Sequence, residues 1–144
     1  MIAGFTLTKL SVERHTSLQG KIGVKNDLNI RDVQEQPLAP GVGGNQKAVS
    51  FAFVFTVTYT PHVADITILG NVIYAAAPKT ITEILSTWKE KKKVSADISV
   101  DILNFVLHTC NIRALELAQE FNLPLHIPMP KVNLQQKTAN AYIG

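Results

Sequence analysis

The sequence has little cysteine, no long hydrophobic run and no phosphate-binding glycine motif, and each absence excludes a class of protein. A single cysteine, Cys110, excludes a disulfide within the chain. No run of about 18 apolar residues is present, so we expect no membrane insertion. The N-terminus MIAGFTLTKL has no basic segment followed by an apolar block and predicts no secretory signal. We therefore expect one soluble, cytoplasmic domain over residues 1–144.

Residue types that carry chemistry are present, but without the spacing that chemistry needs. The glycine segment 41–44 (GVGG) fits neither GxGxxG nor GxxxxGK[ST]. The four histidines lack metal-ligand spacing and are interpreted as surface or locally hydrogen-bonded residues: His15, His62, His108 and His126. On a helix, Cys110 would point away from His108, which argues against a nucleophile pair. These patterns predict no enzyme, no metal and no cofactor.

The N-terminal half has the period of β-strands. Phe5 and Leu7 alternate with threonines, and the apolar phase then shifts to Leu10 and Val12, which predicts a bulge. Residues 24–33 resemble a second, irregular strand.

Two further strands are predicted as a hairpin. Residues 48–60 alternate strictly and place five large residues on one face: Phe51, Phe53, Phe55, Val57 and Tyr59. Residues 65–75 form the next strand after a short turn around Pro61.

The C-terminal half is predicted to be helical. Thr80 and Glu83 have capping-box spacing before a short helix whose buried stripe is Ile81, Ile84, Leu85 and Trp88. A long helix starts near Asp97 or Ser99, and its main apolar stripe is Leu103, Leu107, Cys110, Ala114, Leu117 and Phe121. Strands followed by helices indicate an α+β fold with the helices on one face of an antiparallel sheet.

The long helix is apolar on more than one side, because Ile98, Ile102, Phe105 and Val106 add a second surface. A single sheet covers only one side of a helix, so the other side is expected to contact another subunit. The predicted interface residues of this homo-oligomer are Ile102, Phe105, Val106 and Thr109.

The order of these elements resembles that of the SecB-like export chaperones. The resemblance covers residues 5–133 and is most specific at the long helix and the proline-bearing segment NLPLHIPMPKVN that follows it. It implies a four-stranded antiparallel sheet with a Greek-key connection. It also implies a dimer or tetramer with long helices sandwiched between subunits, and ATP-independent holding of unfolded polypeptides during protein transport or folding.

Three features depart from that family. The crossover 20–27 has no aromatic residue, and residues 133–144 are too few for the family's last helix. The first strand offers one acid, Glu13, beside Lys9 and Arg14, so docking on SecA is not favoured.

Two functions remain open at this point. In the first, unfolded polypeptides bind apolar residues beside the crossover and on the proline-bearing segment: Ile22, Val24, Leu28, Leu123, Leu125 and Ile127. In the second, a structural or adaptor oligomer binds a defined partner or nucleic acid through the basic run Lys89–Lys93. Nucleic acid is the less favoured partner, because the aromatics alternate as core residues and are not interleaved with basic ones.

Overall fold

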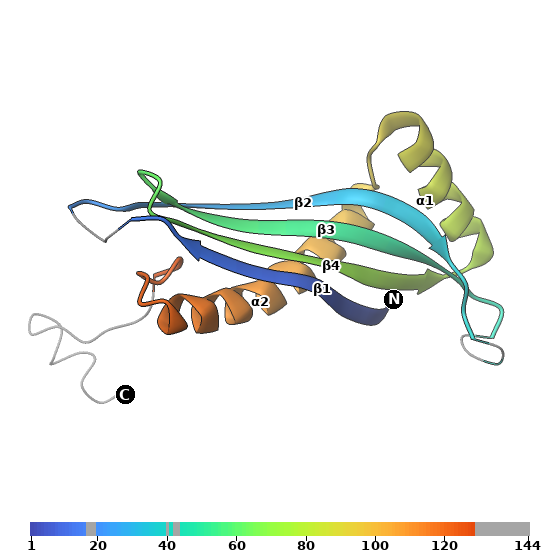
Figure 1. Ribbon diagram of the computed structural model, residues 1–144. Coiled ribbons are helices and arrows are strands. Elements are labelled where there is room, and N and C mark those ends of the chain that lie inside the picture. Colours follow the sequence, from blue (N-terminus) through green and yellow to red (C-terminus); the bar gives the residue numbers. More distant parts are fainter. Residues whose placement is uncertain (17–19, 40, 42–43, 129–144) are drawn as a thin grey trace, which may run out of the picture.

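The computed structural model describes residues 1–16, 20–39, 41 and 44–128. Its elements are four strands and two helices: β1 (Ile2–Arg14), β2 (Gly23–Gln36), β3 (Lys47–Thr60), β4 (Ala64–Ala76), α1 (Pro78–Lys91) and α2 (Ala96–Glu120) (Figure 1). The strands form one antiparallel sheet in the order β1-β4-β3-β2. The chain therefore crosses from one edge of the sheet to the other between β1 and β2, which is the Greek-key arrangement. The predicted α+β fold with a four-stranded antiparallel sheet is confirmed.

The predicted bulge in the first strand is present. Phe5 pairs with Val72 and Leu10 pairs with Ile68, with a register shift between Leu7 and Lys9. Because side chains alternate between faces, one extra residue returns the apolar positions to the face that carries the helices. β2 has a comparable shift between residues 30 and 32 and is longer than predicted.

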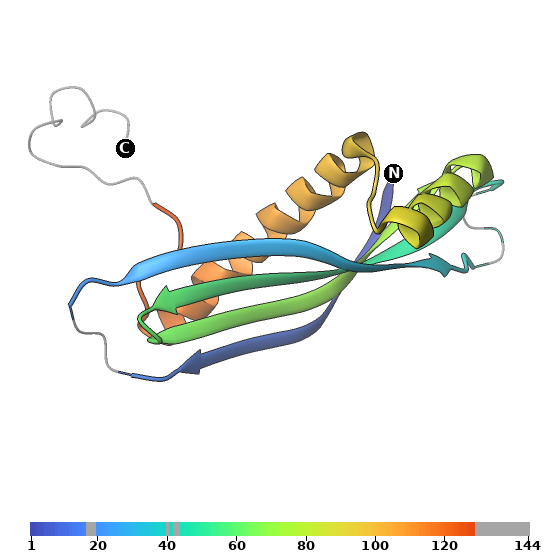
Figure 2. The same ribbon diagram turned by 90° about the horizontal axis from the view of Figure 1, so that it is seen from above.

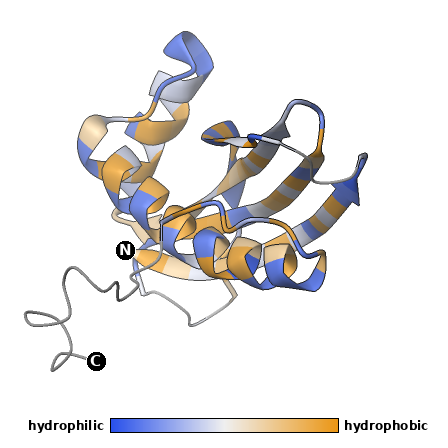
Figure 3. Cartoon of the chain, turned by 90° about the vertical axis from the view of Figure 1, so that its left-hand side faces the viewer, coloured by the Kyte–Doolittle hydropathy of each residue, from blue (hydrophilic) through white to orange (hydrophobic). Residues whose placement is uncertain are grey.

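The side chains of the β3–β4 hairpin differ between the two faces of the sheet. The five large residues predicted on one face of β3 are all buried, with at most 1% of their surface exposed. Their neighbours on the opposite face are small or polar and half-buried: Ser50, Ala52, Val54, Thr56 and Thr58. Figure 3 shows the alternation of hydropathy along the strands.

Gly70 lets an aromatic side chain lie across the sheet. A Cβ at this position would come within 2.4 Å of the Thr6 carbonyl oxygen and 2.8 Å of the Phe53 ring. The Phe53 ring therefore lies over β4 and stacks on Phe5 at 5.6 Å between centroids. Phe5 in turn meets the Phe105 ring of α2 edge to face at 5.4 Å.

α1 begins three residues earlier than predicted, because a cap at Thr80 would make Ile81 the first helical residue. Ala77 is the N-cap, Pro78 opens the helix, and no side chain caps it, so the interpretation of Thr80 as the cap is wrong. Proline needs no backbone N–H at the first helical position, which explains why the helix starts there. The predicted stripe packs on the sheet, with Ile81, Ile84 and Trp88 buried and Leu85 half-buried.

The buried stripe of α2 differs from the predicted one. Its buried residues recur at every fourth position: Ile102, Val106, Cys110, Ala114 and Ala118. Leu107 and Phe121 of the predicted stripe are each 39% exposed. A helix has 3.6 residues per turn, so a strict spacing of four drifts around it by about 40° per step. That drift suits a helix crossing the sheet at an angle, as α2 does (Figure 2).

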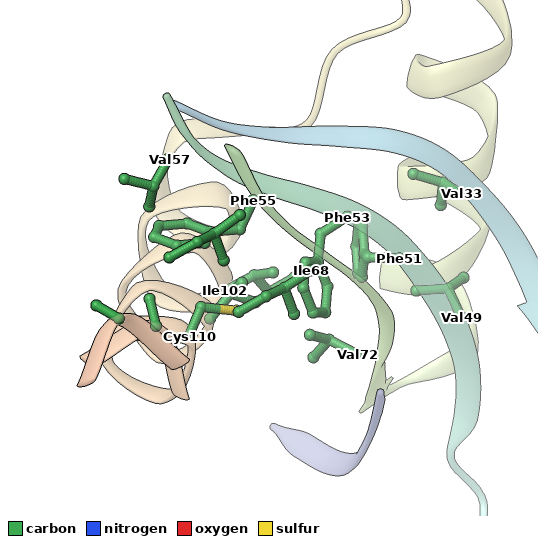
Figure 4. Packing of buried hydrophobic residues seen from close by; sticks show 14 of the residues in the cluster. Val33, Val49, Phe51, Phe53, Phe55, Val57, Ile68, Val72, Ile102 and Cys110 are labelled. Carbon is green, nitrogen blue, oxygen red and sulfur yellow. The ribbon is translucent and has the colours of Figure 1, made fainter. Parts of the chain in front are cut away.

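Both helices pack on the same face of the sheet. Val33 and Val49 lie beside α1, while Phe55 lies toward α2, which contributes Ile102 and Cys110 to the same core (Figure 4). The predicted tail 133–144 lies outside the described residues, as do parts of the crossover loop and of the loop at residues 38–45.

Candidate functional site

α2 keeps a large apolar surface after it has packed on the sheet. Val100 is 54% exposed, Ile112 47%, Leu107 39% and Phe105 37%. With about 100° between successive residues, Phe105 and Leu107 lie on opposite flanks of the buried stripe, and Val100 and Ile112 point away from the sheet. α2 therefore exposes apolar residues on both flanks, and on its outer side it exposes Val100 and Ile112 with the polar Asn104 and His108 between them.

The four predicted interface residues divide into two pairs. Ile102 and Val106 have no exposed surface, because they fill the core of their own chain, so they cannot contact a second subunit in this fold. Phe105 is exposed on the flank facing β1, and Thr109 is half-buried one turn later. The surface that α2 offers to a partner is consequently shifted from the predicted one towards Val100, Phe105, Leu107 and Ile112.

The chain turns back sharply at the C-terminal end of α2. Asn122 adopts a left-handed backbone conformation with φ of 53°. The Leu123 N–H donates to the Ala118 carbonyl at 2.8 Å, and Arg14 Nη1 donates to the Phe121 carbonyl at 3.1 Å. The following segment then runs back beside the helix; we call residues 123–128 the strap.

The apolar residues of the strap are not all exposed, although the sequence prediction required that. Leu123 is 6% exposed and belongs to the core, whereas Leu125 and Ile127 are half-buried. Leu123 was expected on a free binding surface, and the tight turn at Asn122 explains why it is buried instead. Leu125 and Ile127 remain partly open to a ligand.

Three side chains from different elements hold the strap. The Tyr59 hydroxyl donates to the Pro124 carbonyl at 2.6 Å, and Asn26 Nδ2 donates to the His126 carbonyl at 3.4 Å. His126 Nε2 lies 2.7 Å from Asn111 Oδ1 on α2. Burial raises the pKa of Tyr59, so its hydroxyl stays protonated and can donate at any physiological pH.

His126 is buried with half of its hydrogen-bonding capacity unused. It is 5% exposed and meets the Phe55 ring edge to face at 6.2 Å. Since Nε2 donates to Asn111, Nδ1 carries a lone pair, and it has no partner among the described residues. Burial lowers the pKa of His126, because a charged imidazolium there would lack both water and a second acceptor.

The predicted crossover residues lie beside the strap. Val24 pairs with Tyr59 and Leu28 with Phe55, so both belong to the face of the sheet that carries the helices. Val24 is 39% exposed, whereas Ile22 and Leu28 are half-buried. The Asn26 hydrogen bond joins this strand to the strap, so the two predicted binding segments form one surface.

The histidines are less scattered than the sequence suggested. His15 and His62 stack with ring centroids 4.2 Å apart, and His15 Nε2 lies 2.8 Å from Asp65 Oδ2. Within the described ranges, no three His, Cys, Asp or Glu side chains are grouped so that they could hold a metal ion. These contacts join the end of β1 to the β3–β4 turn.

The residues that hold the strap were missed by sequence reasoning. Tyr59 was assigned only to the core, and the polar positions Asn26 and Asn111 interrupt apolar patterns without forming a motif. The available signal was such an interruption, because a polar residue on an otherwise buried face needs a hydrogen-bond partner. Nothing in the sequence indicated that this partner is the segment after the long helix.

Comparisons with known proteins support the fold. No sequence family and no curated protein matches the chain. Among solved structures, the chain is similar to the SecB-like chaperone Rv1957 of Mycobacterium tuberculosis, determined in complex with a ChAD peptide from the HigA1 antitoxin. The TM-score is 0.54 at 9% identity, over 92% of this chain and 89% of the other. None of the helices in the described part of the chain is both long and apolar enough to cross a membrane. The chain therefore has a SecB-like fold.

Proposed function

We propose that this protein is a homo-oligomeric holding chaperone that binds unfolded polypeptides without nucleotide or metal. The observation that carries the proposal is the apolar surface of α2, where Val100, Phe105, Leu107 and Ile112 are each more than one-third exposed. A helix with apolar residues on its flanks and its outer side is stable in water only when further protein covers it.

A second copy of the chain is the proposed partner of α2. Aromatic and aliphatic residues of this kind form the centre of stable subunit interfaces. A dimer or tetramer that pairs these helices would leave the strap and β2 at its periphery. The SecB-like neighbour was solved with a bound peptide, and its fold is the support for expecting polypeptide clients here.

The proposed client surface consists of Val24 and Leu28 on β2 with Leu125 and Ile127 on the strap. These apolar side chains are partly open and lie along β2 and along the strap, which bends at His126 and Ile127. Each contact with a client would contribute up to about 1.5–3 kcal/mol at full burial. We therefore expect broad client selection and tight binding through several subunits acting together.

The decisive test combines two measurements. We expect the purified protein to elute as a dimer or tetramer in size-exclusion chromatography with light scattering. We also expect it to suppress the aggregation of a chemically denatured test protein without ATP and in the presence of a chelator. A monomer at micromolar concentration that leaves aggregation unchanged would contradict the proposal.

A further inference from the structure

Two side chains donate hydrogen bonds to the backbone of the strap; we call Tyr59, Asn26 and the Phe55 ring beneath His126 the seat. Tyr59 and Asn26 donate to the carbonyls of residues 124 and 126, which are two positions apart. Carbonyls at alternate positions of an extended chain point in the same direction, so any extended segment presents them at this spacing. The two donors therefore recognise main-chain atoms and impose little selection on the sequence of the occupant.

The strap has few contacts with the rest of the chain, so that a client can displace it. Residues 124 and 128 are prolines without an N–H, and no strand ladder joins residues 123–128 to the sheet. Tyr59 and Asn26 donate hydrogen bonds to its carbonyls, His126 donates to Asn111, and the Leu123 N–H donates to the Ala118 carbonyl. The burial of Leu123 and His126 adds to these contacts.

The geometry points to an intramolecular pseudo-client: the strap occupies a polypeptide-binding site between α2 and β2, and an extended apolar segment of a client replaces it there. This inference rests on the proposed function and revises its client surface. Val24 and Leu28 of β2 remain contacts of the client, whereas the client takes the places of Leu125 and Ile127 and does not bind to them. The client chemistry is an extended segment with an apolar side chain over Phe55 and free carbonyls for Tyr59 and Asn26.

A client that displaces the strap has to compete with a segment of the same chain. A tethered segment is present at an effective concentration on the order of millimolar, so a free peptide competes poorly with it. A substitution that weakens the contacts of the strap, and leaves Tyr59, Asn26 and Phe55 unchanged, should therefore strengthen the binding of both a free peptide and a client.

The test uses a fluorescent peptide with the sequence of residues 121–128, FNLPLHIP, and reduced, carboxymethylated α-lactalbumin as the unfolded client. Binding is measured by fluorescence anisotropy on the full-length protein and on His126→Ala, with Glu83→Ala, at an exposed position of α1, as the control. We expect His126→Ala to bind both probes about three- to tenfold more tightly, the range for one lost hydrogen bond in the competing strap. The two probes should compete with each other, and Glu83→Ala should match the wild type.

A second pair of variants tests the seat. In the His126→Ala background, Tyr59→Phe removes one backbone donor and should weaken both probes about two- to tenfold. Tyr74→Phe, the same chemical change on β4, should leave both affinities unchanged. If His126→Ala does not fold, Leu125→Asn weakens the strap instead while its core contacts remain.

Three results would overturn the inference. If α-lactalbumin binds all variants equally and the peptide does not compete, clients bind elsewhere and the proposed function stands alone. If His126→Ala loses client binding, the strap is part of the client site and not a competitor. If α-lactalbumin binds neither the wild type nor His126→Ala, both the inference and the proposed function fail.

Discussion

The two helices lie on the same face of one sheet, yet they differ in the kind of side chain that they expose to water. α1 buries Ile81, Ile84 and Trp88 and turns a charged and polar side outwards. α2 buries a stripe of five residues and still exposes Phe105 and Ile112. Covering a sheet requires only one apolar side of a helix. The remaining apolar surface of α2 is therefore the feature that supports the proposed contact with a second subunit.

The largest expected effect separates the inner side of α2 from its outer side. Val106→Asp places a charge at a position with no exposed surface, which should cost several kcal/mol, a large part of the roughly 5–15 kcal/mol that stabilises a domain. Phe105→Asp, one residue away, should remain folded because that side chain already reaches water. Circular dichroism and urea unfolding measure both. Equal destabilisation by the two variants would contradict the division of α2 into two sides.

The next prediction concerns the oligomer. Phe105→Asp combined with Ile112→Asp should dissociate the assembly, because two charges would be buried at the contact between subunits. Thr82→Asp is the matched control, since it adds a charge to the exposed side of α1. Light scattering at several protein concentrations measures the mass. A double variant with the mass of the wild type would show that α2 is not the interface.

A smaller effect is expected from acidification. The pKa of His126 is lowered by burial from its ordinary value of 6.5, so the unfolded chain takes up a proton at a higher pH than the folded chain does. The stabilisation from the neutral ring is complete above about pH 6.5 and is lost as the pH falls through the lower, folded pKa. The free energy of unfolding should therefore decrease between pH 7.5 and pH 5.

Variants assign that pH dependence to one side chain. His126→Gln should flatten the decrease, because no imidazole remains to be protonated at the strap. His108→Gln, on the exposed surface of α2, should retain the slope of the wild type. If His126→Gln keeps the full decrease, the dependence arises from another group, and the buried strap is not the acid-sensitive element.

The sheet was predictable because the pattern of each strand is set by residues that are close together in the sequence. The strict alternation around Phe55 and the shift of phase between Leu7 and Leu10 each follow from the two-residue period of a strand. Both features hold in the structure, as does the order of strands followed by helices. Whether α1 begins at Pro78 or three residues later depends on one turn of backbone, and the prediction from the sequence was wrong.

The candidate site was less predictable because it depends on contacts between distant segments. The inward side of α2 could not be chosen from its sequence, since Leu103 and Ile102 are equally apolar and only the crossing angle on the sheet selects Ile102. In the same way, Leu123 and Leu125 look alike in an extended segment. The turn at Asn122 buries the first and leaves the second half-open.

The smallest effect is expected for the lysines at the end of α1. Lys92 occupies the C-cap in the left-handed conformation, and its backbone N–H donates to the Trp88 carbonyl at 2.9 Å. Its ammonium group lies 5.6 Å from the centroid of the Trp88 ring. Lys89 and Lys91 lie in the last turn, where positive charge complements the helix dipole. These contacts account for the basic run as a helix terminus.

Lys92→Gln should accordingly lower the free energy of unfolding by about 0.5–1 kcal/mol through the lost cation–π contact, and Lys91→Gln by less. The variant with both changes should bind unfolded polypeptide as the wild type does, and the affinity should depend only weakly on salt. A binding site for nucleic acid built on these lysines would behave in the opposite way, since phosphate contacts release counterions and weaken steeply with salt. Titrating the wild type and the double variant with unfolded protein and with a random oligonucleotide, at low and high salt, separates the two. Suppose that the wild type binds the oligonucleotide but not the unfolded protein, and that the double variant binds neither. This result would contradict the chaperone proposal and would place the binding site of this chain on the lysines of α1.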